Sequence, residues 1–263
     1  MRQSELHYSG RVALVSGGGT GIGRAVALGL VKDGARVAIT GRTEATLQET
    51  AQLSGGRIDP VRCDMSDPEA VTRAMQEIEQ NTGPVDILVN AAGLYTQSAL
   101  ATFDMEEWRK IMEANLFAPA LAIHHVLPGM LARDFGRIVT LGSRSAHAGG
   151  AVTSAYSASK AGVEGLTQSV AHEILWQRKG RANVQANVLY PGQTVTGLLG
   201  TQTDSPERYQ SPEDVYPFVR ALLDRPRWAG AGHTVYRRKI VARGGWRLRA
   251  KQWRANLQQA LGV

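Results

Sequence analysis

The chain has 263 residues with a formal net charge of +7, and its 43% hydrophobic content and 29 glycines are enough to build one α/β domain. The lone cysteine, Cys63, excludes an internal disulfide, and no Cys/His cluster has zinc spacing, so we expect no metal. No run reaches the roughly 18 apolar residues of a membrane span, and residues 1–10 lack an apolar signal core. We therefore expect a cytoplasmic protein without a membrane span.

The first predicted elements are a strand near 11–16, a glycine-rich turn and a helix near 21–33. Glycine lets backbone come close to a bound pyrophosphate, and free N–H groups at a helix N-terminus attract anions. Taken alone, the turn fits an unliganded loop as well as a dinucleotide site. Its candidate cofactor contacts are Gly17, Gly19, Thr20, Gly21, Ile22 and Gly23.

Alternating strands and helices follow. Strands are predicted near 36–41, 57–63, 85–89, 136–142, 183–190 and 234–241, and helices near 44–53, 67–81, 105–133, 153–179 and 212–224. This order predicts an α/β fold with a single doubly wound parallel sheet, Rossmann-like, and helices on both faces. We expect one dinucleotide-binding and catalytic domain over residues 1–263, with the ligand at the carboxyl ends of the strands.

A serine, a tyrosine and a lysine are predicted near the carboxyl ends of the strands, where they could react with a bound ligand. Ser143 ends the strand near 136–142, Tyr156 comes thirteen residues later, and Lys160 lies one helical turn beyond Tyr156. A phenol has an ordinary pKa of about 10, which a cation within about 4–6 Å lowers by roughly 1–3 units. Tyr156 could then exchange a proton with a substrate oxygen that Ser143 holds. The alternative is an ordinary pair on a helix surface.

With these motifs in this order, residues 10–224 resemble the short-chain dehydrogenase/reductase family in its single-domain form. The resemblance implies a catalytic tetrad of Asn115, Ser143, Tyr156 and Lys160. In this tetrad Lys160 also holds the nicotinamide ribose, and Asn115 orders a water. The further cofactor contacts that the resemblance implies are Asp64, Met65, Asn90, Ala91, Gly93, Pro191, Gly192, Thr194 and Thr196.

The end of the second strand bears on the cofactor type. Relatives that prefer NAD tend to carry a carboxylate there, whereas this chain has Gly41 and Arg42, and a guanidinium can bind a phosphate bidentately. We therefore expect NADP(H) to be preferred over NAD(H). A solvated Arg42 is the alternative, and Thr20 stands where some NADP(H) relatives carry a second basic residue.

The segment from about residue 225 is strongly basic. It holds ten Lys or Arg and no Asp or Glu, whereas the preceding residues hold 20 Lys or Arg and 23 Asp or Glu. It fits a cover at a subunit interface, with docking of an acidic carrier protein or an acyl-CoA as an alternative. We do not expect nucleic acid as a partner.

Two functions of different class follow from these features. The first is an oxidoreductase that transfers a hydride between nicotinamide and a ketone or secondary alcohol, as 3-oxoacyl reductases do, with a free, carrier-linked or CoA-linked substrate. The second is a dinucleotide-binding regulatory protein whose basic segment holds an anionic partner. The complete tetrad favours the enzyme. Arg144, beside Ser143, is more simply a surface residue, but it would suit an anionic substrate.

The two longest predicted helices carry many apolar residues. Examples are Leu116, Phe117, Leu121 and Ile123 on the first and Val163, Leu166, Val170 and Ile174 on the second. Relatives pair these helices with their copies across a two-fold axis. We therefore expect a homotetramer, or a dimer if the basic segment obstructs the second interface.

Overall fold

The computed structural model describes residues 7–179, 183–192, 194, 210–225, 234–236 and 239–241. Two predictions from the sequence fall on other residues. The cofactor contact at Thr196 lies outside the described residues, as does most of the basic segment from about residue 225.

An eight-stranded sheet forms the centre of the described chain, in the order β3-β2-β1-β4-β5-β6-β7-β8. The strands are β1 (Val12–Ser16), β2 (Arg36–Gly41), β3 (Ile58–Arg62), β4 (Ile87–Asn90), β5 (Gly136–Leu141), β6 (Val184–Tyr190), β7 (Thr234–Tyr236) and β8 (Lys239–Val241). All neighbouring pairs are parallel except β7 and β8. The strand order reverses direction next to β1, which is where a doubly wound sheet opens a crevice for a ligand.

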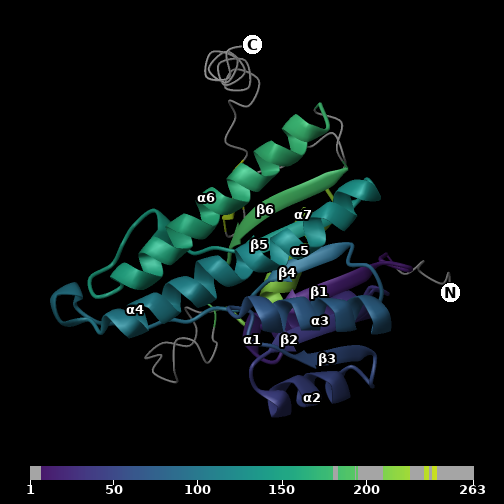
Figure 1. Cartoon of the computed structure of the whole chain (residues 1–263), viewed down its shortest axis with the longest axis horizontal. Coiled ribbons are helices and arrows are strands. Elements are labelled where there is room, and N and C mark those ends of the chain that lie inside the picture. The colour runs from purple at the N-terminus through teal and green to yellow at the C-terminus, as the bar shows by residue number, and fades with distance from the viewer. Residues whose placement is uncertain are drawn as a thin grey trace.

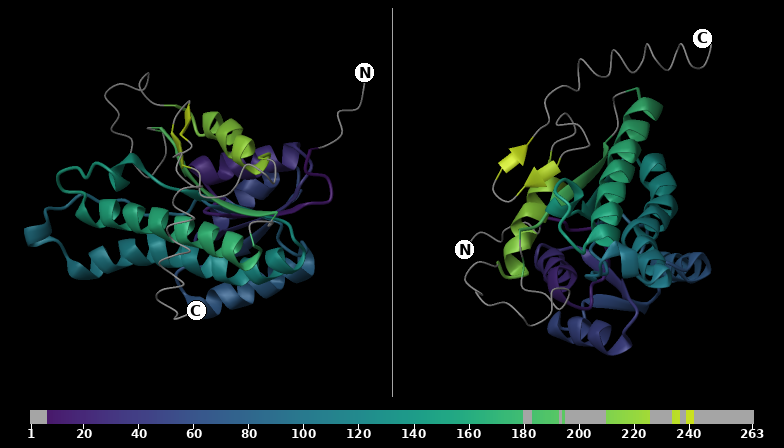
Figure 2. Two further views of the ribbon diagram at one scale, coloured as in Figure 1. Left: turned by 90° about the horizontal axis from the view of Figure 1, so that it is seen from above. Right: turned by 90° about the vertical axis from the view of Figure 1, so that its left-hand side faces the viewer.

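Helices cover both faces of this sheet (Figures 1 and 2). They are α1 (Gly21–Lys32), α2 (Glu44–Leu53), α3 (Pro68–Asn81), α4 (Met105–Met112), α5 (Ala118–Ala132), α6 (Ser154–Gln177) and α7 (Tyr216–Leu223). Figure 2 shows α1 and α7 on one face and α3, α5 and α6 on the other. This arrangement confirms the α/β, doubly wound, Rossmann-like fold predicted from the sequence.

Alternation along the strands divides the apolar core between the two faces. Leu14 of β1 packs with residues of α3, α5 and α6, whereas its neighbour Val15 packs with residues of α1 and α7. Both side chains are fully buried. Successive strand residues point to opposite faces, so a strand covered on both sides must be apolar throughout. This requirement explains the continuous apolar runs in the sequence.

Two predicted elements differ from the structure. The strand predicted over 234–241 is two short strands, β7 and β8, that pair antiparallel. The helix predicted over 105–133 is α4, a π-helical turn η2 (Glu113–Phe117) and α5. Helical periodicity does not reveal one widened turn, because the apolar pattern continues through it.

By length and composition, one helical run in the described residues, Met105–Ala132, is apolar enough to cross a membrane. It comprises α4, η2 and α5. In α5 the residues Ala122, Ile123, Val126 and Met130 are buried in the core. Packing against the sheet therefore accounts for much of the apolar content of this run.

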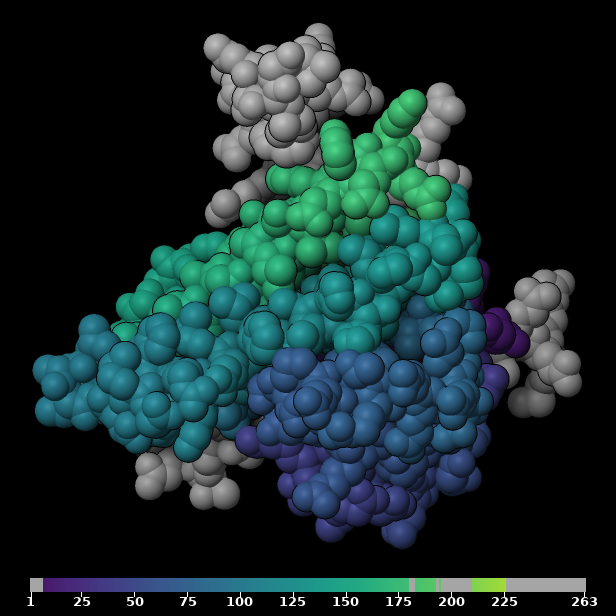
Figure 3. All heavy atoms as spheres, viewed as in Figure 1, coloured from purple at the N-terminus to yellow at the C-terminus, as the bar shows by residue number. Residues whose placement is uncertain are grey.

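The apolar residues expected to face other subunits divide into two groups. Ile123, Val163, Val170 and Ile174 are buried within the chain, so they offer nothing to an interface. Leu116, Leu121 and Leu166 are partly buried and Phe117 is exposed. The sequence therefore overstated the free apolar surface, because α5 and α6 contact each other as well as the sheet (Figure 3).

Candidate functional site

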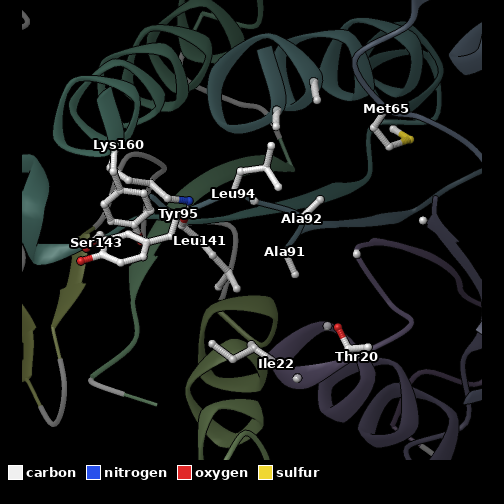
Figure 4. A pocket seen from close by; sticks show the side chains of 18 of the residues that line it. Thr20, Ile22, Met65, Ala91, Ala92, Leu94, Tyr95, Leu141, Ser143 and Lys160 are labelled. Atoms are coloured by element: carbon white, nitrogen blue, oxygen red, sulfur yellow. Dashed lines mark hydrogen bonds between the residues drawn. The ribbon is translucent and has the colours of Figure 1, made fainter. Parts of the chain in front are cut away.

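The carboxyl ends of the strands open into a cleft of about 1320 Å³. The predicted site residues that line it are Gly17, Gly19, Thr20, Gly21, Ile22, Gly23, Arg42, Asp64, Met65, Ala91, Gly93, Ser143, Tyr156, Lys160, Pro191, Gly192 and Thr194. Figure 4 shows Thr20 and Ile22 on one wall and Tyr95, Ser143 and Lys160 together at one end. Asn90 and Asn115 do not line the cleft, and both are buried.

The glycine-rich turn needs glycine for close packing. Gly17 has φ +71°, and a Cβ there would lie 2.7 Å from the backbone of Ala92. A Cβ on Gly23 would lie 2.1 Å from the carbonyl oxygen of Gly17. A side chain at either position would push the turn away from β4 or from α1, so the glycines fix the floor of the cleft.

The N-terminus of α1 is free to receive an anion from the cleft. The Thr20 side chain makes no capping hydrogen bond, and the first turn carries no acidic residue. The first N–H groups of a helix lack partners within the helix and lie at the positive end of its dipole. This end of α1 therefore fits the diphosphate of a dinucleotide.

Arg24 supports the turn, and the sequence analysis missed it. Its guanidinium donates to the carbonyl of Gly19 at 3.0 and 2.7 Å, and it pairs with Glu49 at 2.6 Å. Glu49 lies 25 residues away on α2, so no local pattern in the sequence marks the pair.

Two arginines and an aspartate lie at the ends of β2 and β3. Arg42 and Arg62 line a second hollow of about 430 Å³ together with Asp64. Partial burial opposes ionisation of Asp64, but hydrogen bonds from the Ser66 hydroxyl and N–H and the Arg42 charge outweigh it, so its pKa is lowered. Asp64 is thus an anion next to Arg42. Both were candidate cofactor contacts from the sequence, whereas Arg62 was not.

Ser143, Tyr156 and Lys160 come together as predicted. The Ser143 side chain lies close enough to the Tyr156 phenol to lower its pKa. The Lys160 ammonium lies 5.7 Å from the centroid of the Tyr156 ring and donates to the Leu141 carbonyl at 2.9 Å. Leu141 ends β5 and Ser143 follows it, so this bond joins helix α6 to the strand that leads to the serine.

The expected lowering of the Tyr156 pKa by Lys160 is not what this structure shows. Burial raises the pKa of Tyr156, the Ser143 hydrogen bond acts in the opposite direction, and Tyr95 raises it further. Burial also lowers the pKa of Lys160 to about 8. The sequence showed the pairing of charge and phenol but not the desolvation, which depends on the surrounding fold.

Asn115 lies in the π-helical turn and forms hydrogen bonds to two other segments, the loop after β4 and helix α6. Its Oδ1 accepts from the Leu94 N–H at 2.7 Å, while its Nδ2 donates to the Leu94 carbonyl at 2.8 Å and to Ser159 Oγ at 3.0 Å. A Cβ on Gly93 would lie 3.1 Å from Asn115 Oδ1 and 3.7 Å from Lys160 Nζ. Glycine at 93 therefore lets the Asn115 amide and the Lys160 ammonium approach the same backbone.

Tyr95 is a second site residue that the sequence analysis missed. Its ring meets the Tyr156 ring edge to face, with centroids 4.9 Å apart and an interplanar angle of 87°. Its hydroxyl accepts from Gln97 Nε2 at 2.7 Å. The only signal in the sequence was its place in the loop after the fourth strand, because an aromatic contact across 61 residues leaves no periodic pattern.

The loop after β6 contributes Pro191, Gly192 and Thr194 to the cleft. Thr194 Oγ1 donates to the Gly192 carbonyl at 2.9 Å and accepts from Gln210 Nε2 at 3.1 Å. Within the described part of the chain, no group of three or more His, Cys, Asp or Glu could hold a metal ion.

Known proteins resemble this chain over most of its length. Residues 11–207 match the family model for short chain dehydrogenases. A 3-oxoacyl-[acyl-carrier-protein] reductase of Mycobacterium tuberculosis is 37% identical over 191 residues, covering 73% of this chain and 72% of the reductase.

Solved structures agree with this result. A short-chain type dehydrogenase/reductase from Mycobacterium marinum is 28% identical with a TM-score of 0.79, covering 88% of this chain and 95% of that one. A variant actinorhodin polyketide ketoreductase with NADPH is 29% identical with a TM-score of 0.77, covering 86% and 94%.

The buried Lys160 predicts a pH-dependent stability. Its pKa is about 8 in the folded chain and 10.5 when unperturbed, so between these values the unfolded chain binds more protons and stability rises with pH. The loss of stability caused by burying the charged ammonium is complete below pH 8 and absent above pH 10.5. Lys160→Met should remove this pH-dependent contribution, a difference on the order of 3 kcal/mol. Urea unfolding of both proteins at several pH values measures it, and parallel pH profiles would contradict the assignment.

Proposed function

The chain belongs to the short chain dehydrogenase family of oxidoreductases, and from this premise we propose that it transfers a hydride between NADP(H) and a ketone or secondary alcohol. The observation that carries the proposal is the gathering of Ser143, Tyr156 and the buried Lys160 at one end of the cleft, with Ser143 close enough to the phenol to lower its pKa. A pocket that only bound a dinucleotide would not need this arrangement, so it favours an enzyme over a regulatory protein.

Tyr156 is the group that moves the proton. When bound, the nicotinamide cofactor would supply or accept the hydride. Reduction of a carbonyl requires a proton at its oxygen, and oxidation of an alcohol requires its removal. Burial raises the pKa of Tyr156, so its phenol stays protonated at neutral pH and suits the reductive direction. Ser143 would hydrogen bond the same substrate oxygen and hold it near the phenol.

Several residues are positioned to bind the cofactor. The turn from Gly17 to Gly23 and the N-terminus of α1 fit its diphosphate, while Lys160 fits the ribose next to the nicotinamide. Asn90 is buried, and its Nδ2 donates to Thr140 Oγ1 at 3.2 Å, which joins the end of β4 to β5 next to the cleft. Thr196 remains a proposed contact.

We propose that NADP(H) is preferred over NAD(H). Arg42 and Arg62 meet at one hollow beside the cleft, where Arg62 Nε donates to the Arg42 carbonyl at 3.3 Å. Two guanidinium groups there would bind a 2′-phosphate. The similar ketoreductase was solved with NADPH, which supports the same choice.

We also propose a substrate class, a domain organisation and a cellular location. The 37% identical relative is named a 3-oxoacyl-[acyl-carrier-protein] reductase, which supports a 3-oxoacyl group, free or linked to a carrier or CoA, as one substrate class. We propose a single domain over residues 1–263, a cytoplasmic location, and a basic segment that covers a subunit interface.

Tyr156→Phe should lower kcat by about 10²-fold or more while the dissociation constant for NADPH stays the same, because only the proton donor is lost. Steady-state NADPH oxidation and fluorescence titration measure the two quantities. The control is Tyr8→Phe, which should retain activity, because Tyr8 precedes β1 at the amino ends of the strands and its hydroxyl donates to Asp224. Full activity of Tyr156→Phe would refute the assigned role.

Arg42→Ala should reduce the preference for NADPH over NADH by about 1–3 kcal/mol, the contribution of a charge-assisted contact. Titrating both cofactors against each protein gives the difference. Arg73→Ala removes an exposed arginine on α3 and serves as the matched control, with no change expected. If the unmodified protein binds both cofactors equally, the NADP(H) proposal fails.

We propose a homotetramer, with a dimer as the alternative. Phe117 of η2 and Trp176 of α6 are 46% and 58% exposed, and together with the partly buried Leu116, Leu121 and Leu166 they leave apolar surface uncovered. Light scattering at low and high salt should give four or two times the 28.4 kDa chain mass. Salt should matter if the basic segments meet, since charges are screened beyond about 8–10 Å at physiological ionic strength. A monomer at both salt concentrations would contradict this proposal.

A further inference from the structure

Arg144 is fixed beside the catalytic serine. It begins the short 3-10 helix η3 (Arg144–Ala146), which Ser143 caps by accepting from the Ser145 N–H at 3.2 Å. The Arg144 carbonyl accepts from the N–H groups of His147 and Ala148 at 3.0 and 3.1 Å. The backbone of Arg144 is thus anchored, with its Cα about 3.8 Å from that of Ser143.

The Arg144 side chain is exposed and lines the cleft. No hydrogen bond or ion pair joins its guanidinium to another described residue. Two other cations of the cleft do have partners: Arg109 donates to Glu106 and Glu113, and Lys160 donates to the Leu141 carbonyl. Arg144 therefore brings a positive charge to the cleft that no described side chain neutralises.

The acidic groups of the cleft are already engaged. Among the described residues that line it, these are Asp64, which accepts from Ser66 at the ends of β2 and β3, and Glu113, which pairs with Arg109. A guanidinium presents two parallel N–H donors that match a carboxylate, and one arginine balances one negative charge. A phosphate monoester carries a charge of about −1.5 to −2 at neutral pH, so one arginine would leave part of its negative charge unbalanced.

We propose that Arg144 binds a carboxylate of the substrate, so that the enzyme acts on keto acids or the corresponding hydroxy acids. The inference rests on the proposed hydride transfer at Ser143 and Tyr156 and names the substrate class of that same site. The carboxylate and the carbonyl belong to one molecule, which Arg144 and Ser143 hold at its two ends. Arg144 then sets specificity without moving the proton.

The test compares keto acids with their methyl esters, which keep the carbonyl and lose the charge. The probes are 3-oxobutanoate, 4-oxopentanoate and 5-oxohexanoate and the three esters, assayed with NADPH and the full chain. For at least one chain length, kcat/KM for the acid should exceed that for the ester by about tenfold or more, the value of one charge-assisted hydrogen bond. Arg144→Gln should lower this ratio by a similar factor. Arg144→Lys should lower it less, because lysine keeps the positive charge but lacks the two parallel N–H donors of a guanidinium.

Lys110→Gln is the matched control. Lys110 lines the same cleft, is exposed, and forms no hydrogen bond or ion pair with a described side chain, so this variant removes one positive charge from a different wall. Its acid-to-ester ratio should equal that of the unmodified enzyme. An equal loss in Lys110→Gln and Arg144→Gln would show a general field effect and overturn the assignment to Arg144.

The remaining outcomes separate the two proposals. Equal kcat/KM for acid and ester, or a ratio that Arg144→Gln leaves unchanged, would overturn the carboxylate inference while hydride transfer stands. NADPH oxidation with none of the six probes and with no neutral ketone would overturn the proposed function, and the inference with it.

Discussion

The hydrogen bond from the Lys160 ammonium to the Leu141 carbonyl is the contact on which the candidate site depends. It joins α6 to the end of β5, and in doing so sets Tyr156 against Ser143. A buried ammonium loses its hydration, and one carbonyl restores only part of it, which is why the pKa of Lys160 is lowered to about 8. Burial of the Lys160 ammonium therefore destabilises the folded chain at the place where a proton transfer most needs a fixed geometry.

Other contacts hold the surrounding loops in place around that bond. Asn115, in a π-helical turn, hydrogen bonds to the backbone of Leu94 and to the side chain of Ser159, and so joins the loop after β4 to helix α6. A widened helical turn re-aims one side chain without ending the helix. Tyr95 then packs on Tyr156 from that loop. The aromatic contact buries the phenol and keeps it protonated, in keeping with a proton donor.

The sequence was most informative where function requires a fixed residue type at a fixed spacing. The glycines of residues 17–23 and the pair of Tyr156 and Lys160 were found in this way, as was the sheet, whose alternation of strands and helices is a local pattern. Arg24 and Tyr95 were missed because their partners lie far away in the chain. The direction of the Tyr156 pKa was missed for a related reason: burial is a property of the folded chain, and the charge of a neighbour can be read from sequence while desolvation cannot.

We propose above all that the chain moves a hydride from the nicotinamide to a carbonyl carbon. Incubation with NADPH deuterated at the transferable C4 position and a ketone, followed by mass spectrometry of the alcohol, tests it most directly. Hydride transfer should place one deuterium on the carbinol carbon, delivered from one face of the nicotinamide ring. An alcohol without deuterium from either labelled face, or no alcohol at all across a panel of ketones and keto acids, would contradict it.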